Sequence, residues 1–172
     1  MITSIHTLGP KNTNCEKAAK SWLKKNNINA EIFLYNTLEE AAENLKITEN
    51  SALLSCIVYP KLNDLVFENV NNFELVDCFI EPTYNMVLSQ KVKDASIHKV
   101  YSHPAPVPLF QNLPIGIDKV ELVNSNAEAA NLCLGINDAC MTTKKASDEN
   151  NLFIIHDFGT IPMGFAIHSF KK

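Results

Sequence analysis

Apolar and polar positions along the first third of the chain follow two different periods. Residues 2–8 alternate as in a strand, and residues 9–13 then turn the chain. Apolar side chains recur at helical spacing over residues 15–23, while the lysines there lie away from the apolar stripe. This pattern predicts a strand, a turn rich in hydrogen-bonding groups and a helix whose N-cap lies at residue 12, 13 or 14.

The rest of the chain repeats this alternation. Thr37 with Glu40 and Ser125 with Glu128 form capping boxes that predict two further helices, and residues 143–150 are expected to be helical. Further strands are expected at residues 30–35, 51–59, 73–80, 84–88, 97–101, 119–123, 139–142, 152–158 and 163–170. The nearly unbroken apolar run at 51–59 is typical of a strand in a parallel sheet, so the pattern predicts an α/β fold with a largely parallel sheet.

A proline-rich corner lies just past the middle of the chain, at residues 100–109. Pro104 suits the first position of a helix, and Ser102 or His103 is placed to cap the amides around it. Pro108 lacks an N–H and presses on the preceding turn, so any helix here is expected to be short or distorted. A strand that turns into a helix in this way is an anion-binding corner.

The composition of the chain limits which ligands such a corner can bind and which side chains can bind them. The 172 residues carry 15 cations and 19 anions, a net charge of −4, and none of the cations is an arginine. Bidentate recognition of carboxylate or phosphate by a guanidinium is therefore excluded. An acidic chain without arginine also argues against binding to nucleic acid. Any anionic ligand is expected to be held by lysine, histidine, hydroxyl groups and backbone amides.

The remaining sequence signals concern compartment and metals. No apolar segment approaches the roughly 20 residues that span a bilayer, and the N-terminus does not read as a secretory signal, so a cytoplasmic protein without membrane attachment is expected. Five widely spaced cysteines without a CxxC motif suggest neither a disulfide framework nor a zinc site. Cys15 belongs to an apolar helix stripe, and the other histidines lack metal-like spacing, so no metal site is expected.

Three segments, in order, resemble the prephenate dehydratase family. Leu8–Ala19 reads LGPKNTNCEKAA and is similar to the family's LGPxGTxSExAA opening. Ser102–Leu109 reads SHPAPVPL, like the family's Ser-His-Pro segment, and Val123–Ala130 reads VNSNAEAA, like its Ser-Thr-x-Glu-Ala-Ala segment. Each segment is weak alone, whereas three in order at the family's spacing are fairly specific.

Within that family the closest resemblance is to the prephenate decarboxylases of antibiotic pathways, particularly the bacilysin type. Where dehydratases carry Thr-Arg-Phe on the last strand, this chain reads Met163-Gly164-Phe165. Expulsion of the ring hydroxyl needs a donor, a role that the family assigns to that Thr and that Met163 does not supply. The resemblance therefore implies a decarboxylation that keeps the hydroxyl, leaves the ring non-aromatic and needs no cofactor.

The resemblance also implies an architecture like that of type 2 periplasmic binding proteins, with a ligand cleft between two lobes. The first lobe is expected at about residues 1–80 plus 162–172 and the second at about 81–161, with mostly parallel sheets, no regulatory ACT domain and a possible homodimer. The chain departs from the family at Asn12, where the family has Gly, and at Asn126, where it has Thr. The family's Glu-Asn-Ser segment appears here as residues 60–63.

The candidate site residues come from these corners. His103 titrates nearest physiological pH, so it is the candidate catalytic acid or, as a cation, a carboxylate ligand, with capping as the alternative. Substrate binding is expected from Lys11, Asn12, Thr13, Asn63, Ser102, Ser125, Asn126, Thr142 and Met163. Ser125 caps its own helix by default, which leaves Asn126 as the ligand contact, and Met163 is expected to shape the pocket.

Three functions stay open from the sequence. The first is a decarboxylase-like lyase that acts on prephenate or on a related cyclohexadienyl keto acid, a small carboxylate substrate, in specialised metabolism. The second is a prephenate dehydratase. The third is a non-catalytic protein that binds aromatic or keto acids with the same fold.

Overall fold

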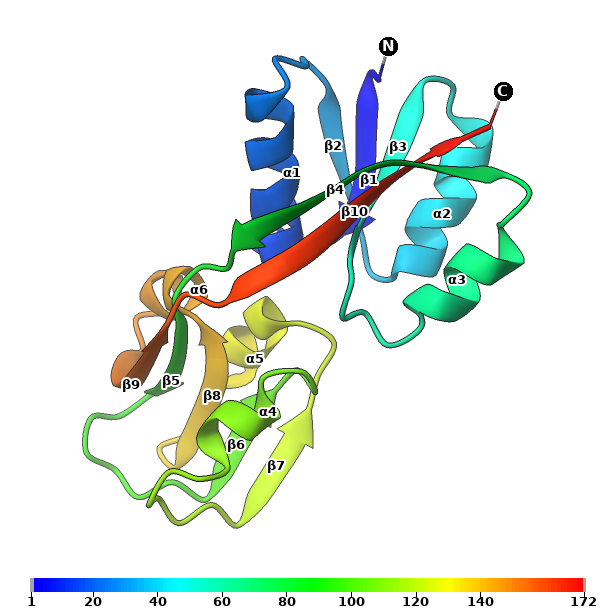
Figure 1. The fold of residues 1–172 in the computed structure, drawn as a ribbon. Helices are drawn as coiled ribbons and strands as arrows, with labels where there is room; N and C mark the ends of the chain where they lie inside the picture. The colour runs from blue at the N-terminus through cyan, green and yellow to red at the C-terminus, as the bar shows by residue number, and fades with distance from the viewer. Residues whose placement is uncertain (1, 172) are drawn as a thin grey trace. The chain divides into compact units, whose positions relative to one another are not determined.

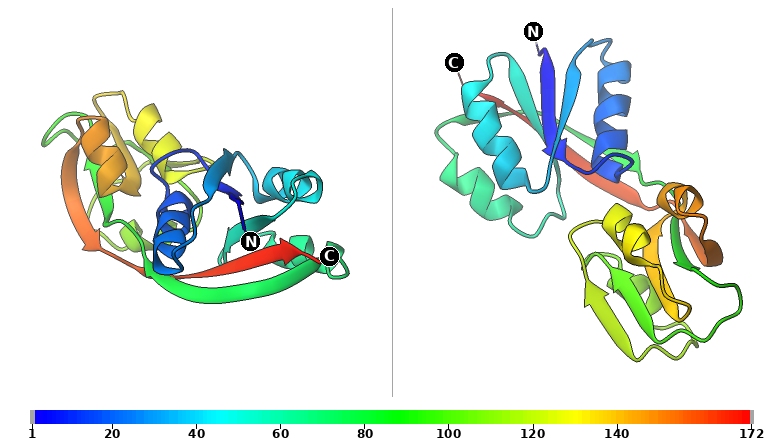
Figure 2. Two further views of the ribbon diagram at one scale, coloured as in Figure 1. Left: turned by 90° about the horizontal axis from the view of Figure 1, so that it is seen from above. Right: turned by 180° about the vertical axis from the view of Figure 1, so that it is seen from behind.

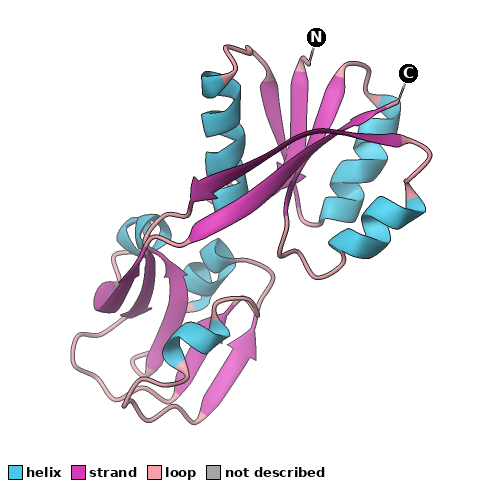
Figure 3. Ribbon diagram, in the orientation of Figure 1, coloured by secondary structure: helices cyan, strands magenta, loops and turns pink. Residues whose placement is uncertain are grey.

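The structure is a computed structural model that describes residues 2–171. The chain divides into two compact units, Met1–Pro82 with Pro162–Lys172, and Thr83–Ile161. Each unit contains one five-stranded sheet with helices packed against it (Figures 1 and 3). The chain therefore leaves the first unit once, builds the second, and returns to the first with its last strand.

The first unit has the strand order β2-β1-β3-β10-β4. Its elements are β1 (Ser4–Leu8), α1 (Asn14–Lys25), β2 (Glu31–Tyr35), α2 (Leu38–Ile47), β3 (Ser51–Cys56), α3 (Leu62–Glu68), β4 (Phe73–Pro82) and β10 (Pro162–Phe170). Strand β1 pairs in parallel with β2 and β3, whereas β10 runs antiparallel to both β3 and β4.

Alternating side chains of this sheet feed two separate cores. Ile5, Leu54 and Phe165 lie on the face that α1 covers, where Trp22 packs with them. Leu53 lies on the opposite face, in a second core with the apolar residues of α2 and α3. The ribbon views in Figure 2 show α1 on one side of the sheet and α2 on the other. The sheet is thus buried on both faces at β1 and β3, as the apolar run of β3 predicts.

The second unit repeats this plan with the strand order β7-β6-β8-β5-β9. Its elements are β5 (Met86–Gln90), β6 (Lys99–Ser102), α4 (Val107–Phe110), β7 (Lys119–Leu122), α5 (Asn126–Leu132), β8 (Asp138–Thr143), α6 (Lys144–Glu149) and β9 (Phe153–Gly159). Strand β6 pairs in parallel with β7 and β8, whereas β5 pairs antiparallel with β8 and β9. Helices α5 and α6 cover one face of the sheet, and Phe110 of α4 packs on the other.

The α/β class predicted from the sequence is confirmed, and three details are corrected. Both sheets are mixed, because each joins a parallel half to an antiparallel half, so the expectation of mostly parallel sheets is wrong. Strand β3 ends at Cys56 rather than at residue 59, and helix α3 follows where only a strand end was expected. Strand β4 continues to Pro82, where a break was predicted.

The helix starts agree with the cap chemistry of the sequence. Thr13, Thr37 and Ser125 are N-caps whose hydroxyls accept hydrogen bonds from the backbone N–H three residues on. In all three cases the glutamate at that position accepts a backbone N–H just before the cap. Among residues 2–171, no helix is long and apolar enough to cross a membrane.

Candidate functional site

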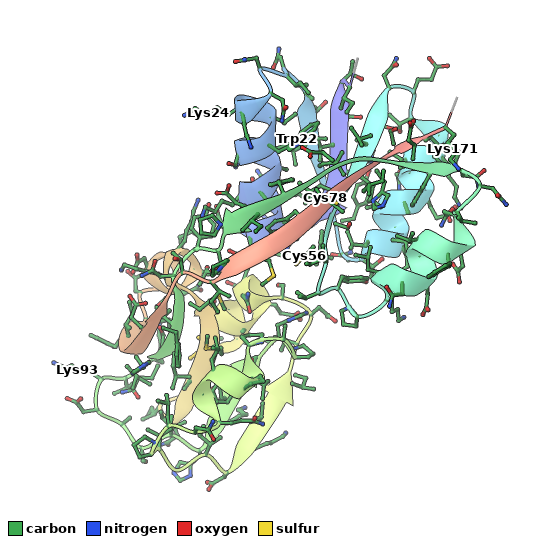
Figure 4. All side chains as sticks on the ribbon, in the orientation of Figure 1. Trp22, Lys24, Cys56, Cys78, Lys93 and Lys171 are labelled. Atoms are coloured by element: carbon green, nitrogen blue, oxygen red, sulfur yellow. The ribbon has the colours of Figure 1, made fainter. Side chains whose placement is uncertain are left out.

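In the first unit, one edge of the sheet collects several corners of the chain. The carboxyl ends of β1 and β2 meet there, with Leu8 opposite Tyr35. The antiparallel register of β10 places Phe165 opposite Cys56, which is the last residue of β3 and is labelled in Figure 4. The start of β10 and the loops after β1 and β3 therefore share the edge at which open α/β sheets bind ligands.

The loop after β1 carries three predicted site residues. Lys11 is exposed and forms no ion pair with any residue from 2 to 171. Asn12 has a φ of 69°, in the left-handed region that Gly and Asn adopt with least strain. The Thr13 hydroxyl lies 3.3 Å from the Leu8 carbonyl as donor and 3.4 Å from the Glu16 N–H as acceptor. Thr13 thus shapes the corner with a hydroxyl that is already engaged on both sides.

The conformation of Asn12 gives a first testable prediction. Asn12→Gly is expected to retain stability, whereas Asn12→Val is expected to lower the free energy of unfolding by about 1–2 kcal/mol, the cost of a left-handed conformation at a residue with a Cβ. Urea unfolding followed through the single tryptophan, Trp22 of the adjacent helix, measures both variants. Equal stability of the Gly and Val variants would contradict the assignment of strain to this position.

Two further predicted residues of the first unit lie near the same edge. Asn63 is exposed in the first turn of α3. Met163 is the second residue of β10, lies opposite Glu81 of β4 and packs against the core that α1 covers. The structure thus brings Met163 to the face of the sheet on which α1 lies, while Asn63 stands on a helix of the other face.

The second unit gathers its corners in the same way. The parallel register aligns Ser102 and Leu122, the last residues of β6 and β7, with Met141, two residues before the end of β8. The Val123 N–H donates to the Ser102 carbonyl at 3.0 Å. The corners that start at residues 103, 123 and 143 therefore lie at one edge of this sheet.

Four of the predicted binding residues lie at this edge, and the hydroxyls of three of them hold it together. Ser102 and Thr142 have no exposed surface, and their hydroxyls donate to the carbonyls of His103 at 2.8 Å and of Asn126 at 2.5 Å. Ser125 is a nearly buried N-cap whose hydroxyl accepts from Glu128 at 3.0 Å. Asn126 differs, because its Oδ1 is buried and has no hydrogen-bond partner among the described residues. Ser102 and Thr142 therefore act as supports here rather than as ligand contacts, and Asn126 keeps an unused acceptor.

His103 follows β6 and closes the proline-rich corner. Its Nδ1 accepts the N–H of Ala105 at 3.2 Å, so His103 caps a turn amide, whereas the N-cap of the following helix is Pro106 and not His103. Helix α4 begins only at Val107, after a turn, and is four residues long, which agrees with the short helix expected from its prolines. No residue from 2 to 171 contributes a hydrogen bond to the other ring nitrogen, Nε2.

The protonation state of His103 follows from these contacts. Burial lowers its pKa below the ordinary value of 6.5. A proton on Nδ1 would also meet the Ala105 N–H, because both groups would then be donors. At neutral pH the ring is therefore uncharged, with its proton on Nε2. The neutral ring presents one N–H donor, and the expectation that His103 holds a carboxylate as a cation stays a prediction.

Other groups do not extend the site. Cys15 is buried in the core beneath α1, and burial raises the pKa of its thiol to about 12, which fits the predicted core role. Over residues 2–171 no cluster of three His, Cys, Asp or Glu side chains is arranged to hold a metal ion. Ile57 was missed by the sequence patterns, because it belongs to an unbroken apolar run. In the structure it is half exposed directly after β3, at the first unit's edge.

Comparison of the sequence with known proteins finds prephenate decarboxylases. A prephenate decarboxylase of Planktothrix agardhii (strain NIVA-CYA 126/8) is 29% identical over 175 residues, which cover 95% of this chain and 86% of that protein. A prephenate decarboxylase of Bacillus subtilis is 27% identical over 179 residues, with 96% and 86% covered. No family model matches the sequence. The predicted resemblance is thus confirmed along nearly the whole chain.

Comparison of the structure with solved structures shows the fold. A prephenate dehydratase from Arthrobacter aurescens superposes with a TM-score of 0.73 at 16% identity, over 99% of this chain and 61% of that one. A tungstate ABC transporter protein from Geobacter sulfurreducens superposes with a TM-score of 0.63 at 12% identity, with 97% and 84% covered. The chain spans about 61% of the dehydratase, and it has the fold shared by prephenate dehydratases and periplasmic binding proteins.

Proposed function

We propose that this protein is a prephenate decarboxylase-like lyase that removes the ring carboxylate of prephenate, or of a related cyclohexadienyl keto acid, without making the ring aromatic. The observation that carries the proposal is the 29% identity to a prephenate decarboxylase over 95% of the chain. The substrate is thus a small carboxylate, and the product serves a specialised, antibiotic-type biosynthesis.

The chemistry needs few groups from the protein. The bond between the ring and its carboxylate breaks, CO2 leaves, and the electron pair passes through the ring diene to a ring carbon that takes up a proton from water. The ring hydroxyl stays in place, because no donor activates its departure. Met163 and Gly164 fit this course, since neither side chain donates a hydrogen bond.

His103 and Asn126 are two polar groups of the second unit with unused hydrogen-bonding capacity. The neutral His103 ring offers its Nε2–H as a donor to a carboxylate oxygen of the substrate, which holds the substrate in place for the reaction. The buried Oδ1 of Asn126 is an acceptor that suits the retained ring hydroxyl. In the first unit, Lys11 is the exposed cation of the β1 corner, available to a carboxylate as a point charge.

Incubation with prephenate tests the proposal directly. Release of CO2 with a product whose ultraviolet spectrum lacks an aromatic ring is expected, and heat-treated protein serves as the control for the spontaneous reaction. Formation of phenylpyruvate would assign a dehydratase and overturn the proposal. Calorimetric binding of prephenate without turnover would instead assign the protein as a binder.

A further inference from the structure

Ile57 and Gly164 lie in contact at the edge of the first unit. Ile57 is the first residue after β3, and its N–H donates to the carbonyl of Gly164 in β10 at 3.1 Å. A Cβ placed on Gly164 would lie 2.4 Å from Cδ1 and 2.9 Å from Cγ1 of Ile57. Both distances are shorter than real carbon contacts, so the Ile57 side chain occupies the space that a side chain at residue 164 would need.

The surface around this contact is apolar. Ile57 is 56% exposed, although a large aliphatic side chain is more often buried. Ile80 of β4 lies opposite Gly164 in the antiparallel register and is 74% exposed. We call Ile57 and Ile80, on either side of Gly164, the apolar wall. The wall stands beside the strand ends at which open α/β sheets bind ligands.

The place of Ile57 distinguishes it from the exposed apolar residues on the helices of the unit. Phe67 of α3 is 75% exposed but lies within a helix rather than at a strand end. Ile57 directly follows the carboxyl end of β3, and the absent side chain of Gly164 leaves it room to project there. The sequence also contains no arginine that could occupy this place as a cation.

We propose that Ile57, accommodated by Gly164, is a specificity-determining residue that packs against the unsaturated ring of the substrate. This inference rests on the proposed function and names the part of the substrate that the first unit recognises. The ring carboxylate loses its charge as CO2 departs, so a cation beside it would stabilise the ground state more than the transition state. An apolar wall binds the ring without that penalty and selects cyclic over open-chain keto acids.

The structural part of the inference is tested by thermal unfolding, independently of any activity. Gly164→Ala is expected to lower the unfolding temperature, and Ile57→Ala added to it is expected to recover most of the loss, because the smaller side chain vacates the contact. Purely additive effects of the two substitutions would overturn the claim that the two residues share one space.

The functional part is tested with prephenate and with substitutions at residue 57. Ile57→Ser is expected to raise KM about tenfold, the effect of one apolar contact in a pocket. Ile57→Val, which keeps an apolar side chain, is expected to raise it less than threefold. The matched control is Phe67→Ser, which removes an exposed apolar side chain away from the strand ends and is expected to leave KM at the wild-type value. An Ile57→Ser variant that behaves like Phe67→Ser would overturn the proposal.

Charge at residue 164 is tested in the Ile57→Ala background, where the contact is relieved. Gly164→Met and Gly164→Arg add side chains of similar length, and the Arg variant is expected to show a kcat at least tenfold below that of the Met variant together with a lower KM. Equal kinetics of the two would overturn the argument against a cation at this place.

Failure of the proposed function is distinguishable from failure of this inference. If wild-type protein binds prephenate in calorimetry but releases no CO2, the proposed function fails. The role of the apolar wall is then tested by the affinity for prephenate, and Ile57→Ser is expected to bind it about tenfold more weakly. An unchanged affinity overturns the inference. If the wild-type protein neither binds nor converts prephenate, both are overturned.

Discussion

Replacing His103 by Asn is expected to lower kcat for prephenate about 100-fold, the loss expected when a group that positions the substrate for the reaction is removed. The Asn Oδ1 takes the place of Nδ1 and still accepts the Ala105 N–H, so the corner stays folded. What the Asn variant lacks is the donor at the position of Nε2. Steady-state kinetics with CO2 release as the readout give kcat and KM separately, and KM is expected to change little.

His103→Gln is the matched variant, because its amide nitrogen reaches the place of Nε2 and donates there. It is expected to lose no more than about tenfold in kcat, since the donor that carries the effect is retained. Wild-type activity is also expected to fall as the pH drops through the lowered pKa of His103, because protonation breaks the contact with Ala105. If the Asn and Gln variants are equally inactive and the wild-type enzyme gains activity in acid, the protonated form of His103 is the active one.

The sequence predicted features that depend on neighbouring residues. Thr37 and Ser125 start helices where their capping boxes indicated, because a cap and its glutamate are three residues apart and need no distant partner. Asn12 is the telling case, since a departure from the family's Gly proved to preserve the left-handed backbone that the corner requires. The capping role of His103 was also within reach of local chemistry.

Features that depend on contacts between distant strands could not be predicted from the sequence. Hydrophobic periodicity identifies β10 as a strand but does not encode its direction, so the antiparallel halves of both sheets went unpredicted. Ile57 falls within the strand predicted at residues 51–59, but the strand ends at Cys56 and Ile57 lies beside Gly164 of β10, an arrangement that only the fold establishes. Likewise, the hydroxyls of Ser102 and Thr142 looked available in the sequence and are occupied by carbonyls that only the fold brings to them.

Acid is expected to destabilise the first unit through its two buried histidines, His6 and His168. Burial lowers the pKa of both below the unfolded value of about 6.5. The unfolded chain then binds more protons than the folded one, so the stability present above pH 6.5 is lost as the pH falls below it. The maximal slope is about 1.4 kcal/mol per pH unit for each histidine.

The two histidines are expected to contribute unequally, and substitution separates them. His6 contacts the hydroxyls of Tyr35 at 2.8 Å and of Ser4 at 3.2 Å, which accept from a protonated ring. His168 packs against Phe73, and its buried Nδ1 has no partner among the described residues, so protonation there would bury an unpaired charged donor. Urea unfolding between pH 5 and 8, followed by Trp22 fluorescence, is expected to show that His168→Leu removes most of the acid dependence. His156→Gln, at an exposed histidine, is the control and is expected to keep the wild-type acid dependence. If the unfolding free energy of His168→Leu changes with pH as steeply as that of the wild type, the assignment of the acid dependence to His168 is refuted.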